Sequence, residues 1–177
     1  MRTDPLVENG WALLEPDDAD IDELMSWFPN AHSVDIWGGP RFRYPFTHDS
    51  FRDDGGFEEM SSFCLRNPAG AMAAFGQVYD RHGRCHLARL ITHPEMRRQG
   101  VGKRLIAMLI KAARQLYDYP ECSLFVYRDN LPAYRCYLAM GFKVQDYPDD
   151  APMKDRCYFL TRATDSQDTQ ATMLRTS

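Results

Sequence analysis

Three extended segments in a row, followed by a long amphipathic segment, most constrain how this chain can fold. Residues 61–66, 71–79 and 85–92 are rich in apolar side chains and are separated by the turn sequences NPAG and RHGR. This spacing predicts three consecutive antiparallel strands. Residues 99–116 then predict a helix, because apolar side chains recur on one face of it: Val101, Leu105, Met108, Leu109, Ala112 and Leu116.

Further elements are predicted before and after this region. They are a strand at 11–16, an Asp-capped helix at 17–28, a strand at 122–127, a helix at 131–140, and two strands within 141–147 and 156–162. The order predicts an α/β fold in which a mixed, mostly antiparallel sheet of about seven strands has helices on both faces. We expect a single domain over residues 1–162 and a polar tail at 163–177.

Composition excludes several classes of protein. A net charge of −4 and a pI near 5.7 argue against a general nucleic-acid binder, and no apolar run is long enough to span a membrane. The N-terminus lacks the apolar core of a secretory signal. Five scattered cysteines favour reduced thiols in a cytoplasmic protein over a disulfide framework. His82, Cys85 and His86 lack a closing pair of ligands, so we expect no metal site.

The sequence RRQGVGKRL at 97–105 places four cationic side chains around two glycines, just before the predicted helix. A nucleotide P-loop is excluded, because Arg97 and Arg104 stand where glycine and a hydroxyl residue are required. Leu105 likewise breaks a dinucleotide fingerprint. Two interpretations stay open. One is a helix N-terminus whose free amides bind an anion, and the other is a glycine-softened turn with solvated arginines.

A second motif lies about 30 residues farther along the chain. Asn130 is followed by Ala133, Tyr137, Gly141 and Phe142. With the motif Arg97-x-x-Gly100-x-Gly102, this spacing resembles the GNAT superfamily of N-acetyltransferases. The resemblance covers residues 61–162 well and reaches back to residues 11–28, but residues 29–60 have no counterpart.

The resemblance implies a GNAT-like fold with acetyl-CoA as cosubstrate and no metal. Its pyrophosphate would bind at the glycine loop, while the pantetheine arm would run along the strand at 85–92 and contact its backbone. Arg97, Arg98, Lys103 or Arg104 would meet the 3′-phosphate or remain solvated. The cofactor-binding residues implied are Leu90, Ile91, Thr92, Arg97, Arg98, Gln99, Gly100, Val101, Gly102, Lys103, Asn130 and Ala133. A backbone N–H near Ile91 would polarise the thioester carbonyl.

The resemblance also implies catalytic roles. Tyr137 matches the general acid that protonates the departing thiolate, although it also fits an apolar helix stripe. Asn130 has the alternative of a helix N-cap. His86 is the candidate base, with a hydrogen-bonded sheet histidine as the alternative and Glu58 and Glu59 as further candidates.

The acceptor is expected to be a primary amine of a small molecule, peptide or protein, with residues 29–60 and the loop at 147–156 on the substrate side. Six carboxylates there predict an acidic rim that attracts a cation, or else a solvated face: Asp53, Asp54, Glu58, Glu59, Asp149 and Asp150. Trp37, Phe42, Tyr44 and Phe46 would line an apolar wall or plug the sheet. The alternative function is a silent acyl-CoA-binding regulatory or assembly module, and a homodimer is left open.

Overall fold

The structure is a computed structural model and describes residues 4–164. It contains an eight-stranded sheet in the order β1-β2-β3-β4-β5-β6-β8-β7. Strands β5 and β6 pair in parallel, whereas the pairs β1/β2, β2/β3, β3/β4, β6/β8 and β7/β8 are antiparallel. The strands are β1 Leu6–Glu8, β2 Trp11–Leu14, β3 Ser61–Arg66, β4 Met72–Arg81, β5 Arg84–Thr92, β6 Glu121–Tyr127, β7 Lys143–Gln145 and β8 Cys157–Ala163.

Within residues 4–164, five α-helices and one 3-10 turn connect these strands. They are α1 Asp18–Ser26, α2 Ala31–Gly38, α3 His48–Asp54, the turn η1 Pro94–Met96, α4 Val101–Leu116 and α5 Leu131–Ala139. The first three helices each begin with a reciprocal capping box. In each box, the N-cap side chain accepts a hydrogen bond from the backbone N–H three residues on, and the side chain of that residue accepts one from the N-cap N–H. Short polar sequences thus start helices in a region that is otherwise rich in Gly, Pro and aromatic residues.

The predicted fold class is confirmed, with differences of detail. Strand β3 coincides with the predicted 61–66, and the NPAG turn is closed by the Asn67 side chain, which accepts from Ala69 N and Ala71 N at 3.1 and 3.0 Å. Strand β1 was not predicted and brings the count to eight. Of the predicted tail, Ala163 ends β8 and Thr164 bonds to Pro120 O and Tyr119 O, whereas residues 165–177 lie outside the described residues.

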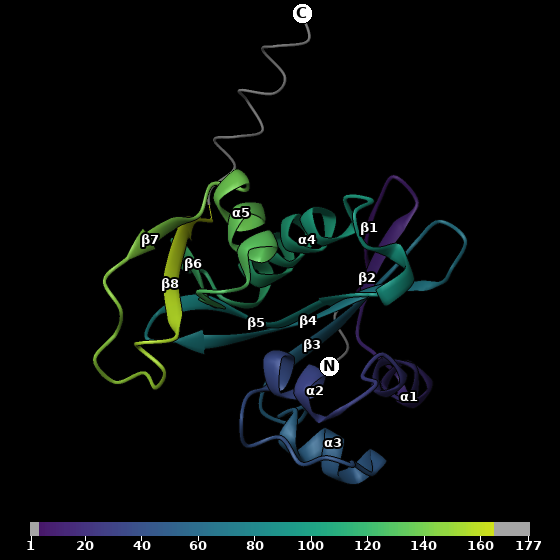
Figure 1. Cartoon of the computed structure of the whole chain (residues 1–177). Helices are drawn as coiled ribbons and strands as arrows, with labels where there is room; N and C mark the ends of the chain where they lie inside the picture. Colours follow the sequence, from purple (N-terminus) through teal and green to yellow (C-terminus); the bar gives the residue numbers. More distant parts are fainter. Residues whose placement is uncertain (1–3, 165–177) are drawn as a thin grey trace, which may run out of the picture. The chain divides into compact units, whose positions relative to one another are not determined.

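The chain forms two compact units. The first contains the described residues up to Tyr79 together with Leu87–Ala112, and the second contains Asp80–His86 and the described residues from Ala113 onward. In the first unit, α1, α2 and α3 lie on one face of strands β2–β4, and α4 lies on the opposite face (Figure 1). In the second unit, α5 packs on β6, which pairs with β8 (Figure 1).

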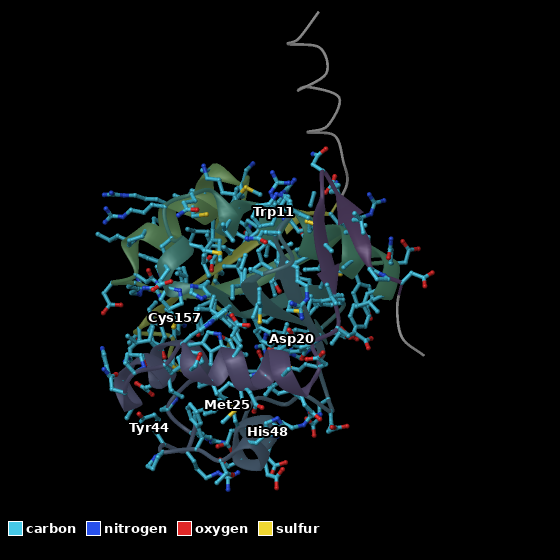
Figure 2. All side chains as sticks on the ribbon, turned by 90° about the vertical axis from the view of Figure 1, so that its right-hand side faces the viewer. Trp11, Asp20, Met25, Tyr44, His48 and Cys157 are labelled. Carbon is cyan, nitrogen blue, oxygen red and sulfur yellow. The ribbon has the colours of Figure 1, made fainter. Side chains whose placement is uncertain are left out.

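Asp20 ties α1 to the sheet within the first unit. Its carboxylate pairs with the Arg66 guanidinium on β3, accepts from Cys64 Sγ at 3.6 Å, and also completes the capping box with Asp17. Figure 2 shows Asp20 on the strand-facing side of α1, whereas His48 lies beyond its other side, near Asp18 and Asp22. This buried charge therefore sets the contact between helix and sheet.

The five cysteines are free, and all but Cys136 are buried. Burial and the nearby Asp20 carboxylate raise the pKa of the Cys64 thiol to about 12, so this thiol stays protonated and inert. The described residues include no group of three or more His, Cys, Asp or Glu that is arranged to bind a metal. None of the helices in the described part of the chain has the length and apolar character needed to cross a membrane.

Candidate active site

The loop before α4 has the backbone geometry of an anion-binding turn. Arg98 and Gly100 both adopt positive φ, +64° and +78°, so the chain cannot continue into the helix until Val101. This is why α4 begins two residues later than predicted. Arg97 is extended and Arg98 is left-handed, so the backbone turns sharply just before the helix, and backbone turns can present successive N–H groups to an anion. A Cβ added at Gly100 would meet nothing within 4 Å, so the space beside this residue is open.

The amides at the start of α4 are available to a ligand. The first helical hydrogen bond runs from Arg104 N to Gly100 O at 3.2 Å. No described residue accepts a bond from the amides of Val101, Gly102 or Lys103. A 16-residue helix adds the positive end of its dipole at this point. These observations fit the pyrophosphate of acetyl-CoA, an anion that needs several convergent N–H donors and little side-chain bulk.

The side chains around this loop divide into exposed and anchored ones. Arg97, Arg98, Gln99 and Lys103 are exposed, whereas Val101 is buried and fixes the helix start. Arg104 lies over the Trp11 ring, with its guanidinium carbon 4.9 Å from the ring centroid. Three cations thus stay available for a phosphate, and the fourth is held by an aromatic partner in the same unit.

Strand β5 carries the backbone expected to face the pantetheine arm. Its register with β6 comprises Cys85↔Cys122 and His86↔Ser123, and the described pairing stops there. Farther along, Leu90, Ile91 and Thr92 are half-buried, and His93 N donates to Ala73 O at 2.8 Å. Between these two parts, Arg89 adopts φ +51°, and its carbonyl accepts from Trp37 Nε1 at 2.7 Å.

Asn130 is the N-cap of α5. Its side chain accepts from Ala133 N at 3.4 Å, Pro132 occupies the first turn, and Gly141 ends the helix at φ +90°. The cap alternative for Asn130 therefore describes its contacts in the structure. Because one lone pair of the amide oxygen and both amide N–H groups are left over, capping is compatible with a bond to a ligand.

The hydroxyl of Tyr137 makes no hydrogen bond to any described residue. The ring packs edge-on against Phe142, with centroids 6.0 Å apart. Burial, with a smaller contribution from Cys136, raises the pKa of Tyr137, so the phenol stays protonated well into the alkaline range. Tyr134, one turn earlier, instead packs on Tyr158 at 4.9 Å. The Tyr137 phenol therefore keeps its proton at neutral pH, and its hydroxyl is left without an acceptor in the described part of the chain.

His86 lies in the interior of the second unit. It is 2% exposed, its Nδ1 lies 2.8 Å from Ser123 Oγ, and its ring contacts Phe125. Burial, together with the charge of Arg81, lowers the pKa of His86 to about 3. These observations favour the alternative of a neutral, hydrogen-bonded sheet histidine over a base that exchanges protons near neutral pH.

The six carboxylates expected to form an acidic rim are mostly neutralised. Arg43 bonds to Asp54 at 3.0 Å and approaches Asp53 at 3.9 Å. Glu58 pairs with Arg52, and Asp150 pairs with both Arg81 and His82. Four of the six therefore face a cation of this chain, which favours the solvated-face alternative.

The aromatic side chains of residues 29–60 mostly plug the core. Phe51 is fully buried, Trp37 stacks on it at 5.7 Å and 9°, and Phe42 and Phe46 contact its ring at 5.2 and 4.9 Å. They belong to the layer that covers the sheet through α1–α3. Tyr44, with 41% of its surface exposed, lies outside this core.

The predicted site residues fall in different units. Residues 90–103 belong to the first unit, whereas His86, Asn130, Ala133 and Tyr137 belong to the second. Sequence reasoning missed Arg89, although an arginine in the middle of the apolar segment CHLARLIT was a visible signal. A charged side chain inside a strand that is otherwise buried requires a specific partner.

Comparison with known proteins agrees with this geometry. The profile described as "Acetyltransferase (GNAT) family" matches residues 21–142. The ribosomal-protein-S18-alanine N-acetyltransferase from Escherichia coli superposes with a TM-score of 0.61 at 20% identity, over 87% of this chain and 94% of that chain. Spermidine N-acetyltransferase from Vibrio cholerae, solved with CoA and spermine, gives a TM-score of 0.70 at 13% identity, over 89% and 97%.

The solved structures share the fold at these low identities, and the family profile covers more than half of the chain, including the glycine loop and the Asn130–Phe142 motif. The chain therefore belongs to the GNAT family of acetyltransferases, which are acetyl-CoA-dependent N-acetyltransferases.

Proposed function

We propose that this protein transfers the acetyl group of acetyl-CoA to a primary amine by direct attack, and that it does so in the cytoplasm. The observation that carries the proposal is the loop at 97–103, where two left-handed residues precede three helix amides that have no acceptor among the described residues, and where the space beside Gly100 is open. The structural relatives acetylate different amines, a polyamine and a protein alanine. For this protein we therefore propose only the chemical class of the acceptor, a primary amine.

Different residues of this chain bind the cofactor and transfer the protons. The loop amides and the exposed Arg97, Arg98 and Lys103 bind the phosphates, and the backbone of Leu90–Thr92 aligns the pantetheine arm by strand-like hydrogen bonds. Acetyl-CoA supplies an activated acetyl thioester, whose transfer forms a carbon–nitrogen bond as the carbon–sulfur bond breaks. Tyr137 donates its phenolic proton to the departing sulfur. With His86 buried and neutral, the proton released by the amine passes to solvent or to an exposed carboxylate such as Glu59.

A thiol-release assay with acetyl-CoA and a panel of amines tests the proposal. We expect turnover with at least one amine, and Tyr137→Phe should lower kcat by about ten- to a thousandfold, because it removes a general acid while keeping the ring. Tyr134→Phe is the matched control on the same helix and should leave kcat within about twofold. Acetyl-CoA binding without turnover of any amine would identify a silent acyl-CoA-binding module instead.

A further inference from the structure

Arg89 is held in a strained position in the middle of β5. An arginine at φ +51° within a strand is strained relative to an extended backbone, because its Cβ then lies close to the following carbonyl oxygen. The bond from Trp37 Nε1 to the Arg89 carbonyl, 2.7 Å long, fixes this conformation from the helical layer. The fold therefore tolerates a strained backbone at Arg89, which indicates that the position of the Arg89 side chain has a function.

The guanidinium of Arg89 lies among neutral groups. Nη1 donates to Gln77 Oε1 at 2.9 Å and to Gly55 O at 3.2 Å, with Met60 Sδ at 3.4 Å, and Nη2 reaches Asp54 O at 3.4 Å. Nε is buried and has no hydrogen-bond partner among the described residues. A partly buried cation with only neutral partners destabilises the fold, because burial removes water from the charge and no counter-ion replaces that stabilisation.

The nearest carboxylate does not supply that charge. Asp54 lies close enough to influence Arg89 electrostatically, but both of its oxygens are taken by Arg43, at 3.0 to 3.2 Å from Nε and Nη2. The Arg43 backbone N also donates to Asp54 at 2.9 Å. Burial correspondingly lowers the pKa of Arg89 from its ordinary value. Within the described chain, Arg89 therefore lacks an anionic partner.

We propose that Arg89 binds a carboxylate of the acceptor, so that the acceptor is an amine that also carries a carboxylate, as an amino acid does, and not a polyamine. This inference rests on the proposed function. Arg89 directly precedes Leu90–Thr92, the backbone assigned to the pantetheine arm, so an acceptor carboxylate bound there lies near the cofactor. Nη1 is used by the protein, so the donors left for a ligand are Nε and the second N–H of Nη2, and this side of a guanidinium matches the two oxygens of a carboxylate.

The charges around Arg89 agree with this substrate class. A polyamine would need unpaired carboxylates, yet three of the four candidates in the same unit, Asp53, Asp54 and Glu58, already pair with Arg43 or Arg52. A polyamine would also meet the uncompensated positive charge of Arg89. The structure therefore repels a polycation at the same place where it attracts a carboxylate.

Matched acceptors test the inference in the thiol-release assay. Each set of probes compares an amino acid with its carboxamide and with an amine that lacks the carboxyl group. The first set is phenylalanine, phenylalaninamide and phenethylamine, and the second is lysine, lysinamide and cadaverine. Spermidine represents the polyamines. The amide has the less basic amine and hence more free amine at neutral pH, so any preference for the carboxylate cannot arise from amine reactivity. We expect kcat/KM for the carboxylate to exceed that for the carboxamide by about 10- to 100-fold, mainly through KM.

Variants assign this preference to the side chain. Arg89→Met should bring the carboxylate-to-carboxamide ratio close to one, and Arg89→Lys should keep part of it. The control Arg84→Met removes another arginine of β5, which pairs with Glu121, and should keep the wild-type ratio. If Arg89→Met does not fold, the inference is tested by the carboxylate-to-carboxamide ratio of the wild type and by its decrease in Arg89→Lys.

The outcomes separate the two proposals. Absence of turnover with every amine overturns the proposed function and this inference with it. Turnover that favours carboxamides, simple amines or spermidine overturns only the inference, and so does a carboxylate preference that survives in Arg89→Met, because Arg89 would then be a structural tie between β5 and the residues after α3.

Discussion

The glycine loop allows a sharp test, because a matched control position exists in the same unit. Gly100 and Gly70 are both exposed, both have positive φ, +78° and +86°, and a Cβ at either would meet nothing within 4 Å. Replacing either with valine therefore introduces the same backbone strain without a clash. We expect each variant to lose about 1–2 kcal/mol of folding stability, the cost of a side chain in the left-handed region.

Only Gly100→Val should impair cofactor binding. Its side chain would enter the open space beside Gly100, next to the unpartnered amides at the start of α4, and we expect it to displace the pyrophosphate from them. Loss of two charge-assisted hydrogen bonds, at about 1.5–3 kcal/mol each, corresponds to a Kd at least about a hundredfold higher. Gly70 lies in the turn between β3 and β4, where its N–H donates to Asn67 O, so Gly70→Val should bind normally.

Thermal denaturation with and without acetyl-CoA measures both effects. At a ligand concentration of about 100 times the wild-type Kd, binding stabilises the native state by about 2.7 kcal/mol. For a chain of this size that amounts to a rise in Tm of about 5–11 °C. In Gly100→Val the same ligand concentration should give only about 0.4 kcal/mol, or about 1 °C. Equal ligand-induced shifts in the two variants would refute the anion-site assignment and leave a plain turn.

Three further predictions concern stability. Gly102→Ala should raise the stability of the ligand-free protein by up to about 1 kcal/mol in urea unfolding, because glycine is a poor helix residue and the added Cβ lies 3.6 Å from Thr92 Oγ1, but it should weaken acetyl-CoA binding. His86 has a folded-state pKa of about 3 against 6.5 unfolded, so only the unfolded state gains a proton between these values. Stability is therefore complete above pH 6.5 and falls toward pH 3, and His86→Asn should flatten this slope; an unchanged slope would contradict the burial argument. Asp20→Ala should cost about 1.5–3 kcal/mol in urea unfolding, because it removes one half of the capping box and the partner of Arg66, and a loss under about 0.5 kcal/mol would show that this pair is dispensable.

Several elements could be predicted from short-range patterns. Strand β3 was predicted at its observed ends, and α5 was predicted within one residue from Asn130, Pro132 and Gly141. These features are local, because caps, turn residues and apolar periodicity act over a few residues of chain. The start of α4 was predicted less well, since left-handed Arg98 carries no compositional signal, unlike Gly100.

The sequence by itself determined the order of strands and helices from β3 onward, the glycine loop and the family to which the chain belongs. Only the tertiary structure decided the environment of single side chains. Arg89 bonds to Gln77 and Gly55, 12 and 34 positions away, and Ser123, 37 positions from His86, helps to enclose it. Whether a charge is buried, paired or left without a counter-ion depends on such distant contacts, which packing creates and local sequence does not encode.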